Sequence, residues 1–115
     1  MTSYNKENFN NAPRSKFMKA LQAEGISSSA YIWSGFHKMS VLTDHILNLK
    51  WYQKMYSPAR LKRYREELNC PNCDKVCEEE MLTLGSVPSA SRETIDKIFN
   101  AITKVYENSD KLNSI

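Results

Sequence analysis

The stretch that decides the fold runs from Ser91 to Tyr106 and reads SRETIDKIFNAITKVY. Its apolar side chains recur at intervals of three and four residues, which is the period of one face of an α-helix. Ser91 is a natural N-cap, and Glu93 lies in the first turn, where a negative charge is favourable. The sequence therefore predicts an amphipathic helix; its apolar stripe consists of Ile95, Ile98, Phe99, Ile102, Val105 and Tyr106.

A second helix is predicted at Pro13–Glu24. Phe17 and Leu21 are apolar at helical spacing, and Gly25 comes just after the last turn. Glycine accepts the left-handed conformation that closes a helix, and Ile26 behind it can cover the helix end.

Two strands are predicted, at residues 26–33 and at Met81–Leu84. Residues 26–33 pass from small to aromatic and β-branched side chains between two glycines, and Met81–Leu84 is a short apolar run. The polar residues 1–11 indicate an N-terminal arm or short strand, anchored by Tyr4 and Phe9. Helices and strands together indicate an α+β fold.

Between the strands the chain is predicted to be helical. Residues 41–56 indicate one helix, residues 58–68 a second, and residues 71–79 a short third. A loop is expected at Gly85–Ala90 and a frayed tail at residues 108–115. We expect a single α+β domain over residues 12–107.

Composition narrows the functional classes. Two Trp, six Tyr and four Phe give more surface to bury than a disordered chain carries, and no window approaches the roughly 18 apolar residues of a membrane span. The net charge of +3 is too small to indicate a nucleic-acid partner. The basic run Arg60–Arg65 is interpreted as a solvated helix face rather than a phosphate-binding patch. The start of the chain has no apolar signal segment, so a cytoplasmic protein with no membrane partner is expected.

The three cysteines lie close together, at Cys70, Cys73 and Cys77. An odd number at this spacing is no disulfide framework. Three thiolates could hold three corners of a zinc site, with His37 or His45 as the fourth ligand. On a helix the same residues share one face, where reduced cysteines behave as small buried hydrophobes. We favour packing and keep the metal site as the alternative.

No catalytic signature is present. The chain has three glycines, no phosphate-binding loop, no metal-protease motif and no recognisable nucleophile motif. His37, in a predicted loop beside Gly35 and aromatic residues, is the better functional candidate of the two histidines. Its alternative is a partly exposed loop histidine without a role.

Several segments, in order, resemble a known family, the DegT/DnrJ/EryC1/StrS aminotransferases. Pro13–Ile26 is similar to the family stretch "sR..F..aL.aEGI" that opens its small C-terminal domain. Tyr31–His37 resembles a loop that commonly ends in "PLH", and Asn69–Glu79 resembles the "CP.aE.aC.E" helix. Met81–Leu84 stands where the "WLP" strand belongs, and Ser91–Val105 resembles the closing helix. The resemblance covers the chain from about Tyr4 to Tyr106.

The resemblance implies a fold-type I enzyme that uses pyridoxal phosphate. Family members transfer an amino group from glutamate or glutamine to keto-sugars, often nucleotide-linked, or to keto-cyclitols, in amino sugar biosynthesis. The implied fold is a small antiparallel or mixed sheet of about three short strands packed against several helices. The implied partner is the large domain that binds the cofactor, usually within a homodimer. No lysine here matches the family's cofactor-lysine motif, so this chain is expected to bind no cofactor and to be inert alone; Tyr31 and His37 are the expected substrate-pocket residues.

Two departures from the family pattern stand out. Leu84-Gly85-Ser86 replaces the Leu-Pro-His that often follows the short strand, so a histidine is missing there. Residues 41–68 are longer and more helical than the resemblance predicts, and could be a subfamily insertion. Two other readings stay open at this point: a stand-alone interaction module of the same fold, and a small metal-binding protein built on Cys70, Cys73 and Cys77.

Overall fold

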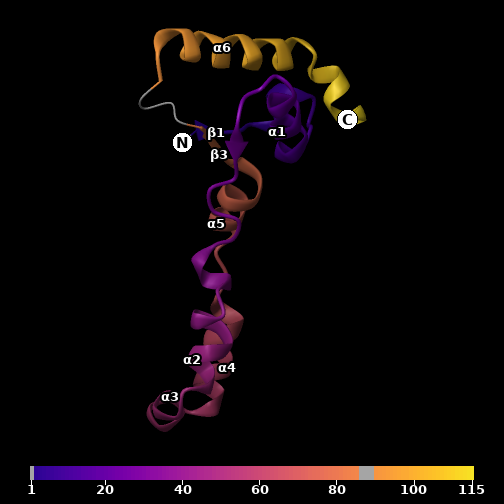
Figure 1. Cartoon of the computed structure of the whole chain (residues 1–115). Coiled ribbons are helices and arrows are strands. Elements are labelled where there is room, and N and C mark those ends of the chain that lie inside the picture. Colours follow the sequence, from indigo (N-terminus) through magenta and orange to yellow (C-terminus); the bar gives the residue numbers. More distant parts are fainter. Residues whose placement is uncertain (1, 86–89) are drawn as a thin grey trace. The chain divides into compact units, whose positions relative to one another are not determined.

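The computed structural model describes residues 2–85 and 90–115 of the chain (Figure 1). The chain divides into two compact units. The first, called here the terminal unit, comprises Met1–Tyr31 and Glu79–Ile115, and the second, the central unit, comprises Ile32–Glu78. The sequence predicts a single domain over residues 12–107, and this stays a prediction. Most of the loop expected at residues 85–90 lies outside the described residues.

The terminal unit contains a three-stranded antiparallel sheet, as far as the chain is described. β3 (Met81–Leu84) is the middle strand, and β1 (Thr2–Ser3) and β2 (Ser28–Ser29) flank it in the order β1-β3-β2. The predicted strand at residues 81–84 is confirmed. So is the expectation of a mixed α and β structure with a small antiparallel sheet.

The strand predicted over residues 26–33 is wrong in length. Only Ser28–Ser29 pairs, with Ser28 opposite Leu84 and Ser29 opposite Thr83. In this register residues 32 and 33 would face residues 80 and 79, which belong to a helical turn, Val76–Glu80. A strand needs an extended partner, so the short β3 limits the length of β2.

The core of the terminal unit is formed by side chains from the N-terminal arm, β3 and the helices α1 (Arg14–Ala23) and α6 (Arg92–Glu107). The ring centroid of Tyr4 lies 5.2 Å from that of Phe9 and 5.0 Å from that of Phe17. The Tyr4 hydroxyl donates a hydrogen bond of 2.7 Å to the Ala12 carbonyl. The buried core side chains are Tyr4, Ala12, Phe17, Leu21, Leu82, Ala101, Val105 and Leu112.

The helices α1 and α6 begin and end within a residue of the predicted bounds. Gly25 has a φ of +81°, and its N–H and that of Ile26 donate to the carbonyls of Gln22 and Leu21, which closes α1. The Ser91 hydroxyl accepts a hydrogen bond from the N–H of Thr94 at 3.3 Å and caps α6. These local signals need no tertiary contact, which explains why the prediction of both helices is confirmed.

The C-terminal segment differs from the frayed tail expected at residues 108–115. It forms a short 3₁₀ helix, Ser109–Ser114, and Leu112 is buried in the core with α1 and α6. Two isolated apolar side chains, Leu112 and Ile115, in a polar segment were too weak a signal to predict this packing.

In the central unit, the single helix predicted over residues 41–56 is interrupted. A turn of π-helix (Val41–His45) leads into α2 (Ile46–Asn48), and Leu49 is extended before α3 (Lys50–Met55). The side-chain amide of Gln53 donates to the Leu47 carbonyl at 3.0 Å, near the end of α2. This contact offsets a backbone hydrogen bond that the interruption removes.

The remaining helices of the central unit agree with the sequence. Ser57 caps α4 (Pro58–Glu67), because its hydroxyl accepts a hydrogen bond from the N–H of Arg60. α5 (Pro71–Lys75) continues into the helical turn Val76–Glu80. α4 lies beside α2 and the preceding turn (Figure 1), as shown by the 2.6 Å ion pair between Arg65 and Asp44. No helix in the described part of the chain is long and apolar enough to cross a membrane.

Candidate functional site

His37 is buried, although it lies in a segment rich in exposed side chains. It belongs to a short 3₁₀ helix, Phe36–Lys38, and only 8% of it is exposed. Gly35 packs directly against its ring: a Cβ at residue 35 would lie 2.6 Å from His37 Nδ1 and 3.0 Å from Cys73 Sγ. The glycine therefore allows the imidazole to approach the backbone, and the prediction of a partly exposed loop histidine is wrong.

The carboxylate of Asp74, from α5, holds this histidine. Asp74 Oδ1 lies 3.2 Å from His37 Nε2 and 2.9 Å from Lys38 Nζ. Lys38 Nζ also lies 2.6 Å from Glu78 Oε1. These residues, with Cys73 and Cys77, form what we name the His37 cluster.

The charges in the His37 cluster stabilise one another. The Lys38 ammonium beside Asp74, helped by the His37 imidazole, holds the pKa of that carboxyl below its usual value. Hydrogen bonds to Asp74 and Glu78 raise the pKa of the Lys38 amine well above its usual value. Lys38 is therefore a permanent cation, and Asp74 is ionised in neutral solution.

The cysteines line the same region of the central unit. Cys73 Sγ and Cys77 Sγ are 4.0 Å apart, and Cys77 is buried while Cys70 is exposed. Burial raises the pKa of the Cys77 thiol, with a smaller contribution from Cys73. The described residues contain no group of three or more His, Cys, Asp or Glu side chains that could hold a metal ion. The burial of Cys77 beside Cys73 supports a packing role for these two thiols.

Lys38 does not fit the role of a Schiff-base lysine for pyridoxal phosphate. The cofactor needs a lysine that can lose its proton and form a Schiff base. Lys38 lies beside Asp74, which also contacts His37, but two carboxylates keep Lys38 protonated. We therefore derive no catalytic step through this cofactor.

Tyr31, the other predicted substrate-pocket residue, lies in the terminal unit, whereas His37 lies in the central unit. Tyr31 is 70% exposed and has no ring contact with another described residue. In the central unit Trp33 is 75% exposed and Phe36 is 63% exposed. Large apolar side chains thus face solvent from Tyr31 onward; the same segment also exposes Ile32, Met39 and Val41.

The His37 cluster can position groups. The buried imidazole of His37 pairs with the half-buried carboxylate of Asp74, and the nearby thiol of Cys77 is biased toward its protonated form. His37 is thus a fixed histidine in a segment with exposed aromatic rings.

Sequence reasoning identified His37 but missed its partners Lys38, Asp74 and Glu78. A spacing of four between Asp74 and Glu78 was visible, but their contact with Lys38 joins segments far apart in the chain. In comparisons with known proteins, no family model, no curated protein and no solved structure matches this chain.

Proposed function

We propose that this chain is the C-terminal small domain of a pyridoxal-phosphate-dependent sugar aminotransferase that resembles the DegT/DnrJ/EryC1/StrS family. In that role it performs no transamination alone. It docks on the domain that binds the cofactor and closes the pocket for a keto-sugar, often a nucleotide-linked one. The specific aminotransferase fold belongs to this proposal, as does the homodimer of the parent enzyme.

The observation that carries the proposal is the exposure of aromatic side chains in the segment that resembles the family's substrate loop. Tyr31, Trp33 and Phe36 are each at least 63% exposed. A run of large apolar side chains in solvent is unfavourable for a self-sufficient protein and marks an interaction surface. A missing domain accounts for this exposure.

The arrangement of the motif segments supports the same proposal. The segment that resembles the opening motif forms α1, the segment at Met81–Leu84 forms β3, and the closing segment forms α6. All three contribute side chains to one core. The helix–strand–helix order of these three elements supports the proposal.

The roles of the site residues follow from this proposal. His37, fixed by Asp74 and by the close approach of Gly35, acts as a positioning residue that holds its segment, and Tyr31 supplies an exposed ring. The cofactor and the Schiff-base lysine come from the large domain. The chain's own lysines have no part in the chemistry, and Lys38 serves to hold Asp74.

The test mixes the purified chain with pyridoxal phosphate, reduces with borohydride and locates modified lysines by mass spectrometry. We expect weak labelling spread over surface lysines. A single saturable lysine would show a cofactor site in this chain and would overturn the proposal.

A second test asks whether the exposed aromatic rings dock on a cofactor-binding domain. The large domain of a family aminotransferase from the same organism is mixed with the chain and the complex is measured by sedimentation. Trp33→Ser should weaken the complex at least tenfold, because a buried aromatic anchor is lost. Trp51→Ser is the matched control, since Trp51 is also exposed but lies in α3. Equal effects of the two substitutions would contradict the proposal that the segment around Trp33 docks on the cofactor-binding domain.

A further inference from the structure

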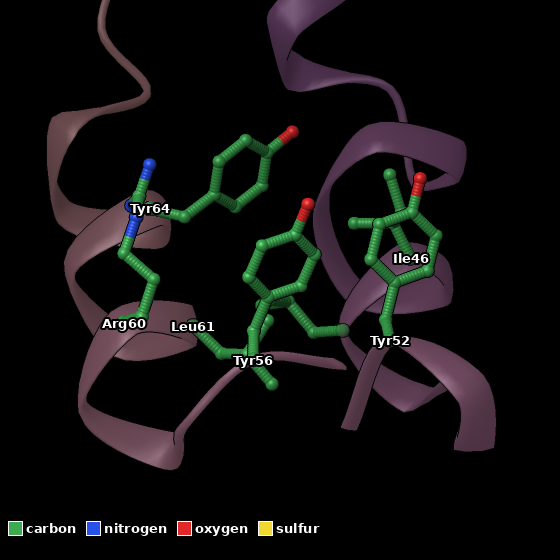
Figure 2. A pocket seen from close by; sticks show the side chains of 7 residues that line it. Ile46, Tyr52, Tyr56, Arg60, Leu61 and Tyr64 are labelled. Atoms are coloured by element: carbon green, nitrogen blue, oxygen red, sulfur yellow. The ribbon is translucent and has the colours of Figure 1, made fainter. Parts of the chain in front are cut away.

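The central unit contains a pocket away from the His37 cluster, and the proposed function does not use it. It has a volume of about 230 Å³ and lies between α2, α3 and α4 (Figure 2). Three tyrosines, one arginine and aliphatic side chains line it, among them Tyr52, Tyr56, Arg60, Leu61 and Tyr64. In Figure 2 the phenol rings and the guanidinium of Arg60 are directed to the same side of the pocket.

Arg60 differs from the other basic residues of α4. Lys62, Arg63 and Arg65 each have a carboxylate within 4 Å: Lys62 faces Glu66, Arg63 faces Glu67, and Arg65 faces Asp44. Among the residues that the structure describes, no carboxylate pairs with Arg60. The neighbours of Arg60 at four residues in each direction are tyrosines, so its guanidinium is presented to the pocket rather than to an acidic side chain.

The tyrosines define the apolar part of the pocket. The ring centroids of Tyr52 and Tyr56 are 5.9 Å apart with an interplanar angle of 20°. A third ring does not fit between them, because stacked rings need at least about 4.5 Å on each side. A bound ring must therefore lie beside this pair, near Arg60 and Tyr64. The Tyr64 hydroxyl is already a donor to the Leu42 carbonyl at 2.9 Å, which fixes that ring as a wall.

The volume limits the size of the ligand. A cavity of roughly 150 Å³ in another protein holds benzene, whereas pockets for drug-sized molecules begin at about 300 Å³. A pocket of about 230 Å³ has room for one six-membered ring and one small substituent. The unpaired guanidinium selects an anionic substituent, which it binds with two N–H groups.

We propose that this pocket is a binding site for a small molecule with one aromatic ring and one carboxylate or phosphate group. Arg60 binds the anionic group, and the rings of Tyr56 and Tyr64 pack against the aromatic ring. The site is independent of the docking surface at Trp33 and Phe36 and of the aminotransferase proposal.

The test titrates the whole chain with phenyl phosphate and with benzoate and follows backbone and Arg60 side-chain signals by NMR. We expect saturable binding of one molecule, with shifts centred on Tyr56, Arg60 and Tyr64. The better of the two probes identifies the anionic group. Benzyl alcohol and inorganic phosphate, which each lack one half of the ligand, should bind at least about tenfold more weakly. Inorganic phosphate binding as tightly as phenyl phosphate would reduce the site to an anion patch and overturn the proposal.

Two substitutions in α4 sharpen the test. Arg60→Gln should weaken the better probe about tenfold or more, whereas Arg63→Gln, whose guanidinium is held by Glu67, should leave its affinity unchanged. Both side chains are exposed, so both variants should fold. Equal losses in the two variants, or no saturable binding of either probe to the folded chain at millimolar concentration, would overturn the proposal.

Discussion

His37 Nε2 lies 3.2 Å from Asp74 Oδ1, and this contact ties the short 3₁₀ helix Phe36–Lys38 to α5. The aromatic side chains of Trp33 and Phe36 flank a histidine that is fixed on two sides, by Asp74 and by Gly35. A segment that exposes this much apolar surface would otherwise collapse onto itself. The contact between His37 and Asp74 fixes the short helix Phe36–Lys38 within this segment.

Gly35→Ala should displace the His37 ring, because the added Cβ would overlap it. We expect a loss of about 1–3 kcal/mol in the free energy of unfolding, typical of an overpacked site, and a large shift of the His37 ring signals in NMR. Gly85→Ala is the control, since a Cβ added at residue 85 would lie 3.6 Å from its nearest neighbours, atoms of Ser27. If the two substitutions have the same effect, the close approach of Gly35 is not a constraint.

Acid should destabilise the chain in part through Asp74. The pKa of this carboxyl is lowered in the folded state by Lys38, so its contribution is present above the unfolded pKa of about 3.8 and is lost as the pH falls through the folded pKa. In the Asp74→Asn variant the free energy of unfolding should therefore decrease less steeply with falling pH below about pH 4. The control is Asp44→Asn, which removes an exposed carboxylate paired with Arg65. An unchanged slope in Asp74→Asn would contradict the proposed role of the Lys38 pair.

The sequence could predict what local chemistry determines. Gly25 and Ser91 end and begin their helices through contacts within a few residues, so α1 and α6 were predicted. The interruption at Leu49 depends on a side-chain contact from Gln53, and the length of β2 depends on a partner strand far along the chain. Neither leaves a clear pattern in the sequence.

The same distinction applies to the candidate sites. His37 stood out by its context, but Asp74 is distant in sequence and was not connected with it. In the pocket, Tyr52, Tyr56, Arg60 and Tyr64 recur at every fourth position, a signal that was present in the sequence and not used. The fold adds that Arg65 pairs with Asp44, whereas no carboxylate in the described part of the chain pairs with Arg60.

Alkylation should distinguish the three thiols. Iodoacetamide at pH 8 should label Cys70 first, Cys73 more slowly and Cys77 last, because Cys77 is buried and its thiol pKa is raised by that burial. Tandem mass spectrometry at successive times gives the order, and labelling in urea should remove the differences. Fast labelling of Cys77 in the folded chain would show that it does not pack inside the central unit.

Leu112→Ala should cost about 2–5 kcal/mol of unfolding free energy, as for other buried leucines. The side chain of Leu112 is buried with α1 and α6, whereas Ile115 is 49% exposed. Ile115→Ala is therefore the matched control and should change the stability by less than about 0.5 kcal/mol. Chemical denaturation of both variants measures the difference, and a neutral Leu112→Ala would restore the expectation of a frayed tail.

The central claim is that the aromatic segment at Trp33 docks on a cofactor-binding domain. The most direct measurement uses the Trp51→Phe chain, in which Trp33 is the only tryptophan, and titrates it with the cofactor-binding domain of a family aminotransferase from the same organism. We expect a saturable blue shift of the Trp33 emission with one domain bound per chain, weakened at least tenfold by Phe36→Ser. An unchanged Trp33 emission up to about 100 μM of the folded domain, a concentration that would reveal even weak association, would contradict the claim.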